Sequence, residues 1–333
     1  MNGRLEDEIK KEKKIENGLK DMPEFVTDWY YHLKASDLTV TSRDVMINTL
    51  KRFLLSIRPD IKNMRVTDIT RTDVNKYMSS IQTKTVTVGK NIIKKPTSDS
   101  YKQGIWYCLN NFFNYFTEAG EFDKNYMNTI KKKKNHDLAR INEHRVLLTS
   151  DDFKKIIEAV DKDNDMTSIR DKAILLLMMG TGIRETALTE INLQDLNMDD
   201  RTLSVTDKGD KPHLYVINDV TADAMVEWLN LRDHYMRWKK PTDALFLSQI
   251  GNRLSVPALR NLVGKYTKKA LGKVLSPHKL RAGFCSILYN QTHDLEFVSR
   301  AVGHSDINVT RRYIVTDNNE KDKSSGIINN IFK

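Results

Sequence analysis

Apolar residues recur at helical spacing through most of the chain, and this periodicity constrains the fold more than any other feature. One stripe consists of Met46, Leu50, Phe53, Leu54 and Ile57. A helix places such residues on a single face, which must pack against a core. Comparable stripes predict three further helices, over about 25–33, 71–81 and 98–119. Together these four helices predict a small bundle in the first half of the chain.

The bundle sequence is interrupted between its third and fourth helices by "TKTVTVGKNIIKKPTSDS", residues 83–100. Its alternation of residue types fits a short β-hairpin. Its lysines and its length fit a mobile basic loop equally well. Both interpretations stay open at this point.

The second half returns to helical stripes after a tract without apolar period. Helices are expected over about 150–160, 169–179, 221–236, 255–271, 277–290 and 294–302, with another around Tyr313. Two β-type runs flank Lys208-Gly209-Asp210 in "RTLSVTDKGDKPHLYVI", which is a strand-turn-strand signal. The sequence therefore predicts a mainly α fold with a small antiparallel β-sheet.

Length and charge set the number of domains and the kind of partner. A chain of 333 residues is long for one core, so two domains are expected. Lys and Arg number 54 against 44 Asp and Glu, a net charge of +10 that suits nucleic acid. The longest apolar run, 173–179, is far below the ~20 residues that a membrane-spanning helix needs. The opening residues are charged and lack an apolar signal region, so we expect a cytoplasmic protein with no membrane partner.

Two smaller features complete the composition. Cys108 and Cys285 sit among apolar helical neighbours, which predicts buried free thiols rather than a disulfide or a zinc site. Residues 124–145 lose the apolar period and include Lys131, Lys132, Lys133 and Lys134 in a row. Such a run is typical of a solvated linker, and in a basic protein it can also lie along a phosphate backbone.

Several polar residues fit neither a core nor an ordinary surface. Arg184 follows the glycine turn "GTG", and His304 directly follows a glycine expected to end a helix. Ser276 and Pro277 suit a helix start, so His278 and Arg281 lie on one face of the first turn, where backbone N–H groups favour an anion. Each has an ordinary alternative: a surface arginine, a structural histidine, a solvated helix end.

Their order and spacing carry more information than any single residue. Five motifs follow one another along the second half of the chain. They are Thr-Gly-x-Arg ending at Arg184, a turn lysine at Lys208, His-x-x-Arg at His278 and Arg281, Gly-His at His304, and Tyr313 nine residues later. This series resembles the tyrosine recombinase family of phage and transposon integrases and Xer-like resolvases. The resemblance implies a charged segment 1–22, a helical core-binding (SAM-like) DNA-binding domain 23–123, a basic linker 124–146, a catalytic domain 147–316 and a tail 317–333.

The resemblance also implies an activity. It assigns Arg184, Lys208, His278, Arg281, His304 and the nucleophile Tyr313 to the active site. The expected enzyme is a site-specific DNA recombinase or integrase of a mobile genetic element, which cleaves and rejoins strands through a 3′-phosphotyrosyl intermediate and a Holliday junction. No metal or cofactor is implied, because the phenol is the nucleophile and arginines can stabilise the charge on phosphorus.

Some positions depart from the family pattern or carry no assigned role. Where the family commonly has a glutamate after the first arginine, this chain has Ala187, so Glu185 or Glu190 is left as the candidate substitute. Lys211 competes with Lys208 for the role of the turn lysine. Arg311 and Arg312 beside Tyr313 are expected to favour DNA without a catalytic role.

The resemblance further implies partners: double-stranded recombination sites, and a homotetramer on DNA that forms through the apolar tail around Ile327 to Phe332. It leaves open an accessory directionality factor, the target sequence and the biological role. Two alternatives remain. One is DNA relaxation like that of a type IB topoisomerase, and the other is a DNA-binding regulator without catalysis.

Overall fold

The computed structural model describes residues 3–88, 91–130, 148–163, 165–206, 212–236, 242–303 and Thr310. The chain divides into two compact units, Met1–Asp137 and Leu138–Lys333, and each is described by itself. Within the described ranges, none of the helices is both long and apolar enough to cross a membrane.

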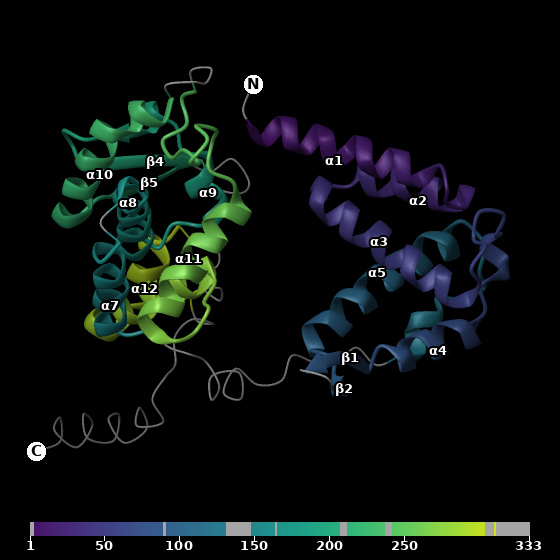
Figure 1. The fold of residues 1–333 in the computed structure, drawn as a ribbon. Helices are drawn as coiled ribbons and strands as arrows, with labels where there is room; N and C mark the ends of the chain where they lie inside the picture. Colours follow the sequence, from purple (N-terminus) through teal and green to yellow (C-terminus); the bar gives the residue numbers. More distant parts are fainter. Residues whose placement is uncertain are drawn as a thin grey trace, which may run out of the picture. The chain divides into compact units, whose positions relative to one another are not determined.

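The first unit is a bundle of helices with one β-hairpin (Figure 1). Its elements are α1 (Gly3–Leu19), α2 (Glu24–Ala35), α3 (Val40–Ile57), the 3₁₀ turn η1 (Val66–Asp68), α4 (Arg71–Ser80), β1 (Thr83–Val88), β2 (Asn91–Pro96), α5 (Asp99–Glu118) and η2 (Tyr126–Thr129). The four predicted helices are confirmed as α2, α3, α4 and α5.

Local signals place the ends of these helices. The Thr39 side chain accepts a hydrogen bond from the backbone of Ser42 at the start of α3, and Thr70 does the same for Asp73 at the start of α4. Gly120, with φ of +82°, follows the end of α5. Between α4 and α5 the chain forms the antiparallel hairpin β1–β2, with Thr83 opposite Pro96. The hairpin alternative is therefore correct.

The bundle core is aromatic. Trp29 on α2 is fully buried and meets the Phe112 ring edge-on, with ring centroids 5.4 Å apart. Its indole N–H donates to the Asn111 side chain at 2.9 Å, so the one polar atom of this ring is satisfied inside the core. Phe25 and Phe116 extend the cluster.

The charged N-terminal segment forms a helix, which sequence periodicity did not indicate. On α1, Ile15 and Leu19 are buried. Glu12 accepts hydrogen bonds from the Tyr30 hydroxyl and, at 2.7 Å, from Arg43. Burial of Ile15 and Leu19, together with the polar contacts of Glu12, therefore holds α1 against α2 and α3.

The bundle also extends past the predicted boundary at residue 123. Met127 in η2 is fully buried, and Trp106 donates to the Ile130 carbonyl at 3.0 Å. One buried methionine in a short 3₁₀ turn leaves no periodic signal, which is why the sequence placed these residues in the linker. The lysine run Lys131 to Lys134 lies outside the described residues.

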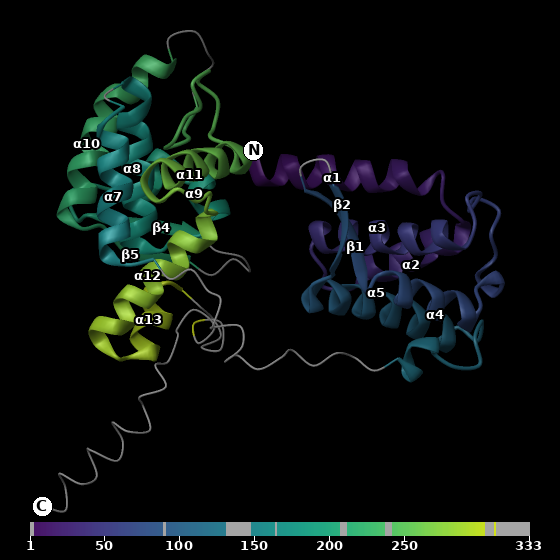
Figure 2. The same ribbon diagram turned by 60° about the horizontal axis from the view of Figure 1, so that its bottom comes forward.

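The second unit is mostly helical and carries a small sheet at one side (Figure 2). Its elements are α7 (Ser150–Asp161), α8 (Met166–Thr181), α9 (Glu185–Glu190), η3 (Leu193–Asp195), β3 (Leu196–Asn197), β4 (Thr202–Thr206), β5 (Pro212–Val216), α10 (Asp219–Arg232), η4 (Asp233–Met236), α11 (Val256–Leu271), α12 (Pro277–Thr292) and α13 (Leu295–Ala301). Both units together confirm a mainly α fold with small antiparallel sheets.

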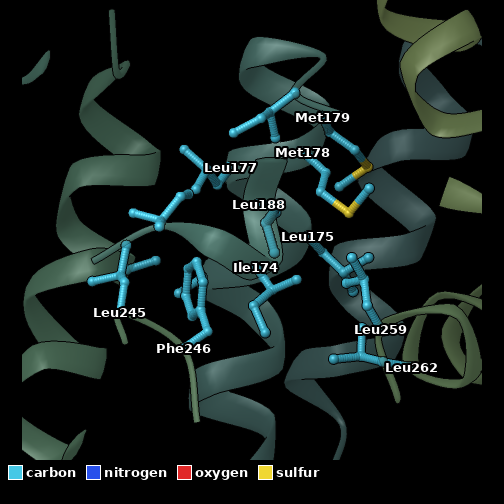
Figure 3. Packing of buried hydrophobic residues seen from close by; sticks show 14 of the residues in the cluster. Ile174, Leu175, Leu177, Met178, Met179, Leu188, Leu245, Phe246, Leu259 and Leu262 are labelled. Carbon is cyan, nitrogen blue, oxygen red and sulfur yellow. The ribbon is translucent and has the colours of Figure 1, made fainter. Parts of the chain in front are cut away.

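Helix α8 runs through the core of this unit. It packs against α7, α10 and α12, so apolar side chains cover it on several sides. Ile174, Leu175 and Leu177 are fully buried, and Figure 3 shows the α8 side chains gathered with Phe246 and Leu259. The later turns of α8, residues 173–179, are apolar on every side, which is typical of a helix in an interior. The end of α8 is consequently a fixed point for whatever follows it.

The sheet has the antiparallel order β3-β4-β5. Strands β4 and β5 pair with Leu203 opposite Tyr215 and Thr206 opposite Pro212. The predicted strand-turn-strand is thus present. Lys208 belongs to the residues that join these strands, 207–211, which lie outside the described part of the chain.

Candidate active site

The first arginine of the motif is placed by a glycine at the end of α8. Gly182 has φ of +65°, and its amide donates to the Met178 carbonyl at 2.9 Å. A Cβ at this position would lie 2.6 Å from the Phe284 ring and 3.1 Å from Val302. Glycine therefore satisfies both the left-handed backbone and the close approach of α12 and of the residue after α13. Two residues later, half-buried Arg184 occupies the N-cap position of α9.

The second arginine comes from the start of α12. Ser276 and Pro277 hold the predicted N-cap and first helical positions, although the Ser276 side chain makes no capping hydrogen bond. His278 is exposed, whereas Arg281, one turn along, is only 3% exposed. The Arg281 guanidinium donates to the Gly182 carbonyl and, at 2.8 Å, to the Val302 carbonyl. A buried charge thus gains two oriented acceptors.

Both arginines meet at the end of α13. Arg184 Nη2 lies 3.5 Å from the Gly303 carbonyl oxygen, a long hydrogen bond, and Arg281 donates to the preceding carbonyl. Successive Cα atoms are about 3.8 Å apart, so the two guanidinium groups are brought to neighbouring points. The residue that follows Gly303 in the sequence is His304. Residues separated by nearly a hundred positions are therefore gathered beside the Gly-His motif.

The two arginines also act electrostatically on Cys285, one turn beyond Arg281 on α12. Burial raises the pKa of the Cys285 thiol to about 11, although the positive charges of Arg281 and Arg184 act in the opposite direction. Both predicted free thiols, Cys108 and Cys285, are buried as expected. The cysteine beside the arginine pair is accordingly a neutral packing residue at ordinary pH.

The two candidate glutamates have other partners. Glu185 forms an ion pair with Arg260 on α11, with Nε to Oε2 at 3.0 Å. Glu190 interacts electrostatically with Arg253. Burial lowers the pKa of Arg253, and the negative charge of Glu190 offsets part of this decrease. Ala187 is buried on α9. The described contacts therefore engage Glu185 with Arg260 rather than with Arg184.

One residue at this place was missed by the sequence analysis. Nε2 of His213, on β5, lies 3.3 Å from the carbonyl oxygen of Ala301. Ala301 directly precedes Val302 and Gly303, whose carbonyls bind the two arginines. The only sequence signal was its position two residues before buried Tyr215, which puts both on the inner face of the strand.

The remaining predicted site residues lie outside the described part of the chain: Lys208, His304, Arg311, Arg312 and Tyr313. Thr310, three residues before Tyr313, is described and fully buried. The structure thus brings together Arg184, Arg281 and the start of the Gly-His motif, with His278 in the same helical turn as Arg281.

Solved structures of a site-specific recombinase and of an integrase have a similar fold. A crystal structure of the XerH site-specific recombinase bound to difH substrate in a pre-cleavage complex has a TM-score of 0.63 at 21% identity, covering 86% of this chain and 79% of that one. A lambda integrase tetramer bound to a Holliday junction has a TM-score of 0.61 at 16% identity, covering 87% and 76%. The helical unit followed by a helical unit with a small sheet is therefore the architecture of this class.

Sequence comparison identifies the family. Residues 147–320 match the model of the phage integrase family. A tyrosine recombinase XerC of Pseudomonas fluorescens (strain Pf0-1) is 35% identical over 170 residues, which are 51% of this chain and 56% of that protein. The chain thus spans about half the length of the curated relatives it matches. The chain belongs to the phage integrase family, which confirms the resemblance drawn from its motifs.

Proposed function

We propose that the protein is a site-specific DNA recombinase or integrase that cuts and rejoins DNA through a 3′-phosphotyrosyl intermediate, with Tyr313 as the nucleophile. One observation carries the proposal: Arg184 and Arg281 converge on the carbonyls of Val302 and Gly303, immediately before His304. Family membership supports the same activity.

The arginine pair suits the binding of a phosphate during attack by a tyrosine on phosphorus. Arg281 is almost fully buried, and among the described residues two of its five N–H groups bind carbonyls. Its plane is therefore oriented before DNA arrives, and the remaining N–H groups can face the non-bridging oxygens. Donors fixed in this way stabilise charge that develops in the transition state without reorganisation, typically by about 3–4 kcal/mol per donor.

The proposed step balances without a cofactor. The phenol oxygen of Tyr313 attacks phosphorus, and the bond from phosphorus to the 5′ oxygen breaks. His278 accepts the phenolic proton, Lys208 protonates the departing 5′ oxygen, and His304 donates a hydrogen bond to a non-bridging oxygen. The 3′-phosphotyrosyl ester retains the energy of the broken ester, so a 5′ hydroxyl from a second strand can reverse the step and complete exchange.

The net charge of +10 supports a DNA partner. We propose that Lys131 to Lys134, Arg311 and Arg312 contact phosphates near the recombination site. Binding through phosphate contacts weakens as salt rises, with a slope of roughly −0.9 in log–log form for each phosphate neutralised. Replacing the four lysines with glutamine should lower this slope and leave sequence preference unchanged.

Exchange between two sites requires several subunits, and the related lambda integrase was solved as a tetramer on a Holliday junction. We propose that the apolar tail, with Ile331 and Phe332, joins neighbouring copies. An apolar hollow of about 490 Å³ between α7, α8 and α10 supports this assembly, because it is lined by Phe153, Ile157, Leu176, Met179 and Val220. Its volume suits several aliphatic or aromatic side chains.

Two matched changes test the assembly. Deleting the residues after Gly326, or replacing Leu176 with Glu, should spare binding to a single site and reduce strand exchange between two sites. Val226→Glu, at an exposed apolar position on α10 that does not line the hollow, serves as the control and should exchange normally. Unchanged exchange by the deletion variant would reject the role of the tail.

A library of nicked duplexes tests the activity itself. When cleavage occurs close to a nick, the short strand that carries the new 5′ hydroxyl dissociates. Because it can no longer reverse the reaction, the covalent protein–DNA adduct accumulates and its DNA can be sequenced. Tyr313→Phe should form no adduct, and adduct formation by this variant at the normal rate would refute the assignment. Relaxation of a supercoiled plasmid that lacks the selected site would favour the topoisomerase-like alternative, and site binding without any adduct would favour the regulator.

A further inference from the structure

The end of α13 presents three consecutive carbonyls to three different elements. Ala301 meets His213 of β5, Val302 meets Arg281 of α12, and Gly303 meets Arg184 at the start of α9. A helix leaves its last carbonyls without helical partners, and its end favours positive or donor groups. This carbonyl row, Ala301 to Gly303, therefore orients the two arginines of the candidate active site, and His213 holds its first member.

The His213 ring is confined on two sides. Its centroid lies 4.3 Å from that of buried Tyr215, at 75° to that ring. On the other side is Gly303, where an added Cβ would come within 3.0 Å of the His213 ring atoms Cγ and Nδ1. Gly303 also has φ of +67°. Glycine at 303 thus permits both the turn after α13 and the close approach of the imidazole.

The direction of the hydrogen bond follows from its acceptor. A carbonyl oxygen only accepts, so Nε2 of His213 must carry a hydrogen and donate it to Ala301. In this contact the sheet, through β5, is tied to the helix end that orients both arginines.

We propose that His213 is a positioning residue for strand cleavage: its Nε2–H fixes the carbonyl row against β5 and thereby holds Arg184 and Arg281 in the geometry that receives the phosphate. This inference rests on the proposed function. Loss of the donor leaves both arginines charged and close to DNA, so affinity persists. Their orientation in the transition state degrades, so the cleavage step slows.

Two substitutions separate the donor from the ring. His213→Phe keeps an aromatic ring between Tyr215 and Gly303 and removes the donor. His213→Gln keeps an N–H donor of similar reach and removes the ring. The same two replacements at Leu214, the exposed neighbour on the other face of β5, are the matched controls.

The rate of covalent adduct formation is measured at saturating nicked duplex, and DNA affinity is measured separately. For His213→Phe we expect the rate to fall roughly three- to tenfold, the effect of one hydrogen bond, with affinity within about twofold of wild type. His213→Gln should recover most of the rate, and both Leu214 variants should match wild type. A normal rate for His213→Phe, or a rate for His213→Gln as low as that of His213→Phe, overturns the proposal.

A second readout does not depend on cleavage. The amides of Val302 and Gly303 donate to Val298 and Arg300 at the end of α13, so their hydrogen exchange reports how firmly this end is held. Exchange should accelerate in His213→Phe and stay near wild type in His213→Gln. Equal exchange in the three proteins overturns the proposal. Absence of any adduct from the wild-type protein, with exchange behaving as expected, would instead count against the proposed function.

Discussion

Gly182 at the end of α8 offers a quantitative test of how the arginine site is built. Alanine here must adopt a left-handed backbone, which costs about 1–2 kcal/mol. It must also place a Cβ 2.6 Å from the Phe284 ring, and overpacking of this kind typically costs about 1–3 kcal/mol more. Gly182→Ala should therefore destabilise the second unit by about 2–5 kcal/mol.

Gly272 at the end of α11 is a close control. It has φ of +67°, nearly the value of +65° at Gly182, but an added Cβ would meet nothing within 4 Å. Gly272→Ala should cost only the backbone component, about 1–2 kcal/mol. The difference between the two variants isolates the contact with Phe284.

Urea unfolding followed by hydrogen exchange on peptides of α8 and α12 measures the stability of this unit alone, which matters because a two-unit chain need not unfold in one step. Gly182→Ala should also slow adduct formation, since the displaced Phe284 and Val302 adjoin the carbonyl that Arg281 binds. Equal costs for the two alanine substitutions would show that close packing at Gly182 is not what the site requires.

Three further predictions concern single side chains. Burial raises the pKa of Glu12, but hydrogen bonds from Tyr30, Arg43 and Lys34 outweigh it and lower the pKa to about 2. At pH values above 4.5, ionised Glu12 therefore stabilises the folded bundle by at most about 3 kcal/mol. This stabilisation is lost as the pH falls from 4.5 towards 2. Glu12→Gln should remove this pH dependence from the free energy of unfolding of the first unit, measured by urea titration. Arg281→Lys keeps the charge but cannot fork between two carbonyls, so adduct formation should fall more than roughly tenfold with DNA affinity nearly unchanged in a binding titration. Cys285, with its pKa raised to about 11, is a thiolate in roughly one molecule per thousand at pH 8, so alkylation should be slow in the native protein and fast in urea, as followed by mass spectrometry.

Local rules predicted most of the fold. Stripes such as Phe25, Trp29 and Leu33 become helices because the same spacing that defines the stripe also buries it. Helix α1 escaped prediction because its buried apolar residues, Ile15 and Leu19, make too short a stripe, and because the contacts of Glu12 with other elements leave no local pattern. The hairpin β1–β2 was ambiguous because its alternation is short and its residues are basic.

In the candidate site too, some residues could be predicted from the sequence and others could not. Arg184 and Arg281 could be found from motif order, and the structure adds that they share neighbouring carbonyls. The pairing of Glu185 with Arg260 could not be foreseen, since 75 residues separate them. His213 carries no motif at all. Its place depends on how β5 meets the end of α13, a tertiary contact that sequence spacing does not encode.

The central claim is that Tyr313 becomes joined to DNA while Arg184 and Arg281 hold the phosphate. The most direct measurement traps the adduct on a nicked duplex, digests protein and DNA, and identifies the nucleotide-linked peptide by mass spectrometry. The account predicts a single modified peptide carrying a 3′-phosphotyrosyl bond at Tyr313, absent from the Tyr313→Phe protein and strongly reduced in Arg281→Lys. A 5′ linkage, or attachment at any other residue, would contradict it.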